Sequence, residues 1–369
     1  MSRPAKVTII IPTFNRENYL RQCLESLLHQ TLPPHQIVVV NDGSTDDTKG
    51  LLKPYLGQIQ IIESRQLGKS GAINEGLKQT TGDYVWIFDD DDVALPDALS
   101  RFTKPLLDHP EYGYSFSSFF FTPTRKGSFE LGRATGEYLI PDLEKDGPLI
   151  PLLENNYLGG AALFARTLCY KKVGPFDPAL VRSQDYEMAI RIVRAFKGIR
   201  VSGAPTFHYR QHEGLRGSLR DRFNSSQQIN KWLEYDQKIF RKFYRDLTLE
   251  EYLPPGMPLA HEKRRALLQR IEVMAIKLLF DEIIKDLHEL EKVNGCQPFS
   301  EAEKAIIHKM ADIPYYKKRL FMKNTGVIRA VKHLAKNSAS VKMLQKELFR
   351  RVLKNLFTKP PRLSRLIKK

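Results

Sequence analysis

Short apolar runs alternate with helical patterns over the first 92 residues of the chain. Four runs rich in β-branched and aromatic residues predict strands at residues 7–12, 36–40, 59–64 and 84–88. Their continuous apolar character is typical of strands that are buried on both faces, as in a parallel sheet. The alternation therefore predicts βαβ units and a mainly parallel α/β sheet flanked by helices.

The helical pattern is clearest between the first two strands. Four leucines with helical spacing predict a helix over residues 16–30 that packs on one face: Leu20, Leu24, Leu27 and Leu28. Asn15 precedes this helix and is expected to be its N-cap. After the second strand, a tight turn at Gly43 is expected to lead into a short helix capped by Ser44 or Thr45.

The pattern of elements changes near residue 217. Before it, we expect a helix at 93–111, a strand at 113–121, a strand and helix within 159–177, and a helix at 183–196. After it, strand patterns vanish and helices are expected at 222–246, 259–294, 301–311, 327–336 and 340–357. We therefore expect an α/β domain over residues 1–217, a helical domain over 218–312 and a helical tail over 313–369.

Composition places the chain among globular proteins with about two domains, since it has 369 residues of which 42% are apolar. Three widely spaced cysteines form no metal-binding spacing and favour a reducing compartment. The N-terminus lacks the layout of a signal peptide, and no window offers 18 uninterrupted apolar residues. A cytoplasmic location is expected.

The positive charge of the chain lies in its tail. Residues 313–369 hold 17 Lys and Arg and one acid, Glu347, which leaves 41 basic and 41 acidic residues in the rest of the chain. Five apolar residues fall on one helical face of the tail, and basic residues fall largely on the other: Val341, Leu344, Leu348, Val352 and Leu356 against Lys342, Lys346, Arg350 and Lys354. A basic amphipathic helix is typical of binding to an anionic membrane surface.

Membrane binding would place the protein peripherally on the inner face of the cell membrane. Three alternatives remain open for the tail: a helix docked on the rest of the protein, an oligomerisation segment, and a nucleic-acid-binding segment. The last would need basic residues interleaved with exposed aromatic residues, and aromatic residues are few in the tail, so no nucleic-acid partner is expected.

Acidic residues follow two of the predicted strands. Asp42 comes after the second strand, and Asp89 to Asp92 form four consecutive carboxylates after the fourth. The carboxyl ends of the strands of an open α/β sheet form the edge where ligands bind. Carboxylates there suit a hard divalent cation such as Mn²⁺ or Mg²⁺, whose other ligands can be water and phosphate oxygens. The alternative is a solvated acidic turn with a helix-capping aspartate.

Five stretches in order resemble the inverting glycosyltransferase family 2, which has the GT-A fold. The matching stretches, which cover roughly residues 7–215, are TIIIPTFNRENYLRQCLESLLHQT, VVVNDGSTDDT, LGKSGAINEGLKQTTGDYVWIFDDDD, GGAALFARTLCYKKVGPFD and SQDYEMAIR. The resemblance implies transfer of a sugar from a nucleotide-diphosphate donor. A cation beside the departing diphosphate would stabilise the charge that develops in the transition state.

The resemblance also implies roles for single residues at the donor side. Asp89 and Asp91 resemble the outer pair of the DxD-type motif that holds Mn²⁺ or Mg²⁺, and His212 lies where it could reach the same metal. Asp90 and Asp92 are more doubtful, because alternation along an extended chain would point them elsewhere. Other residues are expected to contact the donor: Pro12, Thr13, Asp42, Lys69, Asp90, Gly159 and Gly160.

Asp185 resembles the catalytic base that takes the proton of the acceptor hydroxyl. Three further residues follow a predicted strand: His208, Arg210 and His212. Two interpretations stay open: these residues contact the pyrophosphate or the acceptor, or they belong to a surface loop whose histidines are satisfied by hydrogen bonds.

Departures from the family pattern narrow the expected activity. Gln184 stands in place of the acid that usually precedes the base, and Ile73 stands where many members have arginine. The QxxRW motif of processive polysaccharide synthases is absent. We expect a non-processive hexosyl- or N-acetylhexosaminyl-transferase that acts on a glycan or lipid-linked acceptor in cell-surface polysaccharide biosynthesis.

Two alternatives to this activity stay open. One is a catalytically silent protein that only binds nucleotide-sugars, and the other is a nucleic-acid-binding protein that uses the basic tail. A homo-oligomer is also an open expectation.

Overall fold

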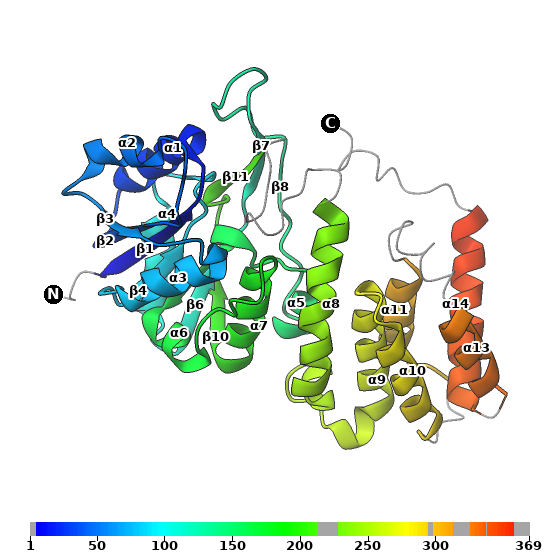
Figure 1. Cartoon of the computed structure of the whole chain (residues 1–369). Coiled ribbons are helices and arrows are strands. Elements are labelled where there is room, and N and C mark those ends of the chain that lie inside the picture. The colour runs from blue at the N-terminus through cyan, green and yellow to red at the C-terminus, as the bar shows by residue number, and fades with distance from the viewer. Residues whose placement is uncertain (1–4, 213–227, 294–297, 313–324, 337, 358–369) are drawn as a thin grey trace. The chain divides into compact units, whose positions relative to one another are not determined.

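The computed structural model describes residues 5–212, 228–293, 298–312, 325–336 and 338–357. By the contacts within the chain it divides into two compact units (Figure 1): Met1–Leu143 with Pro151–Tyr235, and Glu144–Ile150 with Asp236–Lys369. The expected boundary at residue 217 lies outside the described residues, and the expected tail begins in the undescribed stretch 313–324, so the three-part division stays a prediction.

The first unit is built on a seven-stranded sheet with the order β10-β6-β9-β4-β1-β2-β3. The strands are β1 Val7–Thr13, β2 Gln36–Asn41, β3 Gln60–Glu63, β4 Tyr84–Ile87, β6 Tyr112–Phe116, β9 Leu163–Arg166 and β10 Lys197–Arg200. All neighbouring pairs are parallel except those of β9, which runs antiparallel to β4 and β6. The expected mainly parallel α/β sheet is confirmed, and its four N-terminal strands lie close to the predicted positions.

Helices cover both faces of this sheet (Figure 1). Helices α1 (Glu17–Leu28) and α4 (Ala98–Asp108) share a buried cluster with alternate residues of β1 and β4, including Ile9 and Trp86. Helix α3 (Gly68–Lys78) packs against β1 and β2. It lies on the opposite face, since its Gly76 abuts Ile10. Helix α6 (Thr167–Val173) packs against β9 and α7 (Gln184–Ala195), and α2 (Thr48–Leu52) packs against α1.

A second, four-stranded sheet has the order β5-β11-β7-β8. Its strands are β5 Val93–Ala94, β7 Phe120–Pro123, β8 Gly136–Glu137 and β11 Phe207–Gln211. The single strand expected at 113–121 was wrong, because the chain leaves the first sheet at Ser117 and enters the second at Phe120. The expected helix at 93–111 also begins later, at Ala98, since Val93 and Ala94 pair with β11.

The loops after β1 and β2 are bonded to each other, and this corrects both expected helix caps. Asn15 has a left-handed backbone (φ 54°), and its Oδ1 accepts a hydrogen bond from the Thr45 amide at 2.7 Å instead of capping α1. The Asn15 amide in turn donates to Ser44 Oγ at 3.0 Å. The first amide of α2, that of Thr48, donates to Asp46 rather than to Ser44 or Thr45. The two strand exits are therefore held side by side.

The second unit is helical. Its helices are α9 Leu259–Ile276, α10 Phe280–Glu291, α11 Glu301–Ala311, α13 Thr325–Leu334 and α14 Ala339–Phe357, and α8 Gln228–Asp246 enters it from residue 236. The expected single helix over 259–294 is two helices, since the chain breaks at Leu278, which has φ 55°. Arg270 is paired with the fully buried Asp286, which bonds α9 to α10.

The start of the apolar face of the tail helix α14 is buried within this unit, and Leu348 is half-buried. Val341 and Leu344 are at most 1% exposed, and α14 packs on α10, α11 and α13. Lys342 and Lys346 on the other face are exposed. The side chains of residues 349–357 lie outside the described part of the chain. The described start of the helix therefore fits a docked helix, and not one whose apolar face enters a membrane.

The described helices include none whose length and hydropathy would allow it to cross a membrane.

The close approach of β10 to β6 gives a test of the sheet. Gly198 pairs with Tyr114, and a methyl group at Gly198 would lie 2.1 Å from the ring of Tyr114, which is fully buried and cannot move away. Gly198→Ala should lower the free energy of unfolding by about 1–3 kcal/mol, measured by urea denaturation. Gly136→Ala is the matched control, because open space surrounds that strand glycine. Equal urea midpoints for the two variants would contradict this packing.

Candidate active site

The acidic residues form a turn at the end of β4 rather than an extended strand. The Asp92 amide donates to the Asp89 carbonyl at 3.2 Å, which closes the turn. Because the chain turns, Asp92 comes back toward Asp89, and carboxylate oxygens of Asp89, Asp91 and Asp92 lie within 4.8 Å of one another. The expectation from alternation that Asp92 would point elsewhere was therefore wrong.

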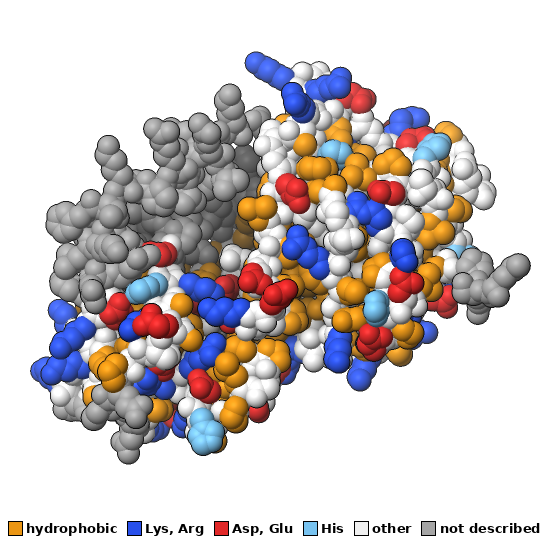
Figure 2. All heavy atoms as spheres, turned by 180° about the vertical axis from the view of Figure 1, so that it is seen from behind, with side chains coloured by type: hydrophobic (Ala, Val, Ile, Leu, Met, Phe, Trp, Pro, Cys, Tyr) orange, Lys and Arg blue, Asp and Glu red, His pale blue; other side chains and the backbone are white. Residues whose placement is uncertain are grey.

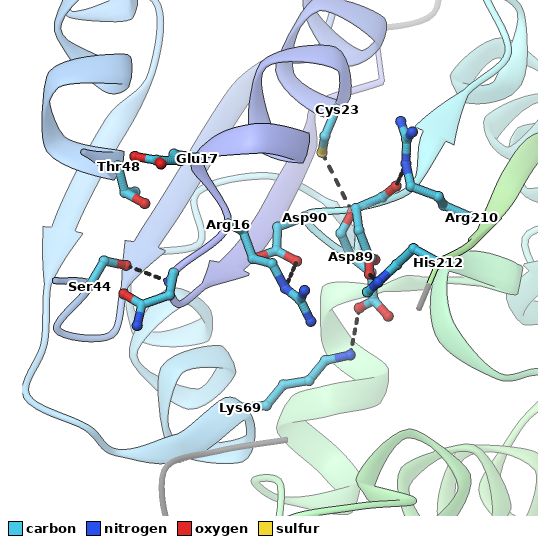
Figure 3. A network of polar contacts seen from close by, with 12 residues as sticks. Arg16, Glu17, Cys23, Ser44, Thr48, Lys69, Asp89, Asp90, Arg210 and His212 are labelled. Atoms are coloured by element: carbon cyan, nitrogen blue, oxygen red, sulfur yellow. Dashed lines mark hydrogen bonds and ion pairs between the residues drawn. The ribbon is translucent and has the colours of Figure 1, made fainter. Parts of the chain in front are cut away.

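Each aspartate of the turn contacts a basic residue from a distant part of the chain, and Figure 3 shows Lys69 beside Asp89 and Arg16 beside Asp90. Lys69 Nζ, in the first turn of α3, lies 2.6 Å from Asp89 Oδ1. Arg16, just before α1, lies 3.9 Å from Asp90, and His212 Nε2 lies 2.9 Å from Asp91 Oδ2. Asp92 Oδ1 accepts the Arg210 backbone amide at 2.9 Å.

These contacts bring most of the expected site residues together, but they set Asp90 apart. Asp89, Asp91, Lys69 and His212 come together as expected. Asp90 faces Arg16 and is not part of the three-carboxylate group.

Burial and crowding oppose ionisation of the turn. Burial raises the pKa of Asp92 well above its usual value, and the charges of Asp91 and Asp89 raise it further. Burial also raises the pKa of Asp90 to about 7, although the Arg16 guanidinium acts against this. Burial alone would lower the pKa of Lys69, but the charges of Asp89 and Asp185 outweigh it and the net pKa is raised. The turn therefore favours bound positive charge.

The donor set of this turn fits a hard divalent cation. Its three clustered groups are all carboxylates, which such cations prefer. Asp92 is fully buried, and its Oδ2 has no hydrogen-bond partner among the described residues. An unpaired carboxylate oxygen is costly to bury unless something positive contacts it.

Asp185 lies in the first turn of α7, where a left-handed Ser183 (φ 54°) precedes the helix. Its Oδ2 accepts the Gly160 amide at 2.9 Å and lies 3.4 Å from Asn156 Nδ2. Gly160 has φ 58°, and a methyl group there would lie 3.9 Å from Asp89 Oδ2. A single cavity is lined by Lys69, Asp89, Gly160 and Asp185, so the expected base and the acidic turn face the same space.

Asp42, at the end of β2, accepts hydrogen bonds from the loop that precedes α3. Its Oδ1 accepts Ser64 Oγ and the Leu67 amide, each at 2.7 Å, and its Oδ2 accepts the Gly68 amide at 2.8 Å. These bonds shape the loop that leads into α3 and places Lys69. Its contact with a nucleotide base stays a prediction.

Pro12 and Thr13 are buried at the end of β1, and the Asp42 amide donates to the Thr13 carbonyl at 2.9 Å. The residues expected at the base pocket are thus neighbours. Their contact with the nucleotide base stays a prediction.

Asn156 and Tyr19 were missed from the sequence. Asn156 follows a loop-rich stretch with no regular pattern, and Tyr19 looks like one more core residue of α1. Tyr19 contacts His212 with ring centroids 4.9 Å apart and Phe129 at 5.5 Å. His208 and Arg210, which were expected to follow a strand, lie within β11. His208 bonds Thr122 at 2.9 Å, whereas Arg210 and His212 contact the acidic turn.

Comparison with known proteins identifies the family. The model of Glycosyl transferase family 2 matches residues 8–169. An uncharacterized glycosyltransferase of Rickettsia typhi is 30% identical over 260 residues, which cover 67% of this chain and 74% of that protein. Another, of Rickettsia prowazekii, is 30% identical over 252 residues, with the same coverage. The chain belongs to glycosyl transferase family 2, and it is a glycosyltransferase.

A solved structure supports the fold. S. aureus TarS 1–349 in complex with UDP-GlcNAc superposes with a TM-score of 0.53 at 17% sequence identity, covering 96% of this chain and 93% of that 1–349 chain. The expected GT-A fold with a helical C-terminal region is confirmed.

Proposed function

We propose that this enzyme transfers a sugar, with inversion and with a divalent cation, from a nucleotide-diphosphate sugar to a hydroxyl group of its acceptor. One observation carries the proposal: the three clustered carboxylates of the acidic turn and the carboxylate of Asp185 belong to one site, linked by Gly160. The fold of TarS, whose structure contains UDP-GlcNAc, supports a nucleotide-sugar as the donor class.

The donor side consists of the acidic turn and the adjoining strand exits. Asp89, Asp91 and Asp92 would hold Mn²⁺ or Mg²⁺, and His212 orients Asp91. Bound there, the cation would supply neutralisation of the charge on the departing diphosphate. Lys69 is a second positive group beside Asp89, within reach of the same phosphates. We assign the nucleotide base to the edge formed by the ends of β1 and β2, where Pro12, Thr13 and Asp42 lie.

Asp185 is the general base in this proposal. Both of its hydrogen bonds, from Gly160 and Asn156, go to Oδ2, and these fix the carboxylate plane. Its Oδ1 is then the oxygen that we assign to the acceptor hydroxyl. Attack from the side opposite the departing diphosphate inverts the anomeric carbon. Proton removal by a positioned base contributes about 10²–10⁴-fold to such a reaction.

The transferred group is a hexose or an N-acetylhexosamine, added once per binding event to a glycan or lipid-linked acceptor of cell-surface polysaccharide biosynthesis. The absence of the QxxRW motif of processive synthases supports the single addition.

An anionic membrane surface is the partner that we propose for the second unit. Five basic side chains in and after α13 and in α14 are exposed: Arg329, Lys332, Lys336, Lys342 and Lys346. Glu347, the one acid in residues 313–369, is bonded to His308. On the face in Figure 2, by contrast, basic and acidic side chains are interspersed over the described residues. Since Val341 and Leu344 on the apolar face of α14 are buried, we expect binding to rest on charge, at about 1 kcal/mol per basic residue.

Removal of divalent cations tests the donor side. Transfer should stop in EDTA and return with Mn²⁺, and Asp89→Asn and Asp91→Asn should lower the rate by about 10²-fold or more, because charge on the diphosphate is then uncompensated. Asp97→Asn is the matched control, since that exposed aspartate pairs only loosely with Arg101 at 3.7 Å. Equal rates in EDTA and Mn²⁺ would contradict metal dependence.

An isosteric change tests the base. Asp185→Asn should lower kcat by about 10²–10⁴-fold while leaving nucleotide-dependent thermal stabilisation intact, because the amide keeps the shape but cannot take a proton. Asp177→Asn, which alters an aspartate bonded to the Ala179 amide, should keep wild-type rates. NMR of the first product formed should show the opposite anomer to the donor. Retained configuration, or a wild-type rate in Asp185→Asn, would rule out this mechanism.

Vesicle flotation tests the membrane surface. The protein should float with vesicles containing about 30% anionic phospholipid, should not float with neutral vesicles, and should be released by about 0.5 M NaCl, which screens charge. Reversing Lys332, Lys336, Lys342 and Lys346 to Glu should abolish flotation. RNA binding without vesicle binding would favour the nucleic-acid alternative instead.

The control variant has the same change in net charge, but its four Lys→Glu substitutions lie in the first unit. The four exposed lysines that it replaces are Lys53, Lys78, Lys104 and Lys171. Equal loss of flotation in both quadruple variants would show that net charge alone matters, and not the surface around α13 and α14.

A further inference from the structure

Arg210, the penultimate residue of β11, is buried beside the acidic turn. Only 1% of the residue is exposed, and it lies 118 residues from Asp92 in sequence. Its Nε donates to the Asp91 carbonyl at 2.6 Å, and its backbone amide donates to Asp92 Oδ1 at 2.9 Å. One arginine thus holds two successive residues of the turn. Figure 3 shows Arg210 near Asp89 and His212.

The same side chain reaches two other segments. Nη1 donates to the Phe129 carbonyl at 2.8 Å, in the loop between β7 and β8, and Nη2 donates to Gln22 Oε1 at 2.5 Å, on α1. The guanidinium lies over the ring of Tyr19 at 5.3 Å, and that ring also contacts His212. Every nitrogen of Arg210 therefore donates at least one hydrogen bond within the protein, and only 1% of the residue is exposed to a substrate.

Arginine is suited to this position for a chemical reason. Its planar guanidinium presents donors in a fixed fork, so one side chain can satisfy acceptors in three directions. Lysine carries a point charge on a flexible stem and could keep only part of this set. Burying the charge is costly, and the neighbouring Asp91 and Asp92 carboxylates partly offset that cost.

We propose that Arg210 is a positioning residue that fixes the acidic turn for cation binding. It holds the Asp91 backbone and Asp92 Oδ1, so that the remaining oxygens of the three carboxylates stay clustered. Through Phe129 it also ties the turn to the loop between β7 and β8. The inference rests on the proposed role of the turn in holding a divalent cation, and it adds a residue that contacts neither the cation nor the donor.

Mn²⁺ titration by calorimetry, without donor, tests the inference on wild type, Arg210→Gln and Arg210→Lys. Loss of a residue that orients metal ligands typically weakens metal binding by about 10–100-fold, and we expect a loss in this range for Arg210→Gln. Arg210→Lys should fall between Arg210→Gln and wild type, because it keeps the charge and loses the fork. In transfer assays, the Mn²⁺ concentration for half-maximal rate should rise by the same factor, and the rate at saturating Mn²⁺ should recover.

Arg270→Gln is the matched control, since Arg270 is also a buried, multiply bonded arginine but lies in the helical unit with Asp286 and Tyr244. It should lower the melting temperature and leave Mn²⁺ affinity unchanged. Unchanged Mn²⁺ affinity in folded Arg210→Gln would overturn the inference. If Arg210→Gln does not fold, wild-type Mn²⁺ affinity in Arg210→Lys would overturn it instead.

Two further outcomes separate this inference from the proposed function. A rate that stays low at saturating Mn²⁺ would place Arg210 in the transfer step and overturn the positioning role. Wild-type protein that binds no Mn²⁺ would overturn the proposed metal dependence, and the inference with it.

Discussion

Repulsion among the carboxylates of one turn is the constraint on which the site depends. Four aspartates follow β4 without a break, and one of them, Asp92, is fully buried. Such a turn is stable only if positive groups and hydrogen-bond donors surround it. The chain supplies them from separate segments: Arg16 before α1, Lys69 in α3, and Arg210 and His212 at the end of β11. Long-range contacts of the first unit thus converge on the four consecutive aspartates.

The sheet order explains why these groups can meet. Parallel pairing of β1 with β2 and β4 brings three strand exits to one edge. The antiparallel β9 starts at that same edge, so the preceding Gly160 lies near Asp89, and the Gly160 amide holds Asp185. The glycine conformation matters here because its φ of 58° is one that other residues rarely adopt. The backbone therefore links the acidic turn to Asp185 through a single residue.

Much of the first unit could be predicted because its elements have strong local patterns. The strands at 7–12, 36–40 and 84–88 are mostly apolar, and the exits that they define place Asp42 and Asp89 correctly. Prediction failed where tertiary contacts override local preference. Asn15 resembles a helix cap in the sequence but bonds the neighbouring loop. The aromatic run at 119–121 gave no sign that the chain passes from the first sheet to the second there. Asp92 was misplaced because alternation assumes an extended chain, and the burial of Arg210 depends on partners more than 80 residues away. The amphipathic tail pattern was real, but it could not reveal that α14 packs on α10, α11 and α13 with Val341 and Leu344 buried.

The central claim is that the turn after β4 holds the divalent cation of a sugar-transfer site. Anomalous X-ray diffraction from crystals soaked in Mn²⁺ and a nucleoside diphosphate tests this claim most directly. The account predicts one strong Mn²⁺ peak in contact with carboxylate oxygens of Asp89, Asp91 and Asp92, with diphosphate oxygens on its other side. A diphosphate bound at this edge without a Mn²⁺ peak at the turn, or a peak held by other residues, would contradict it.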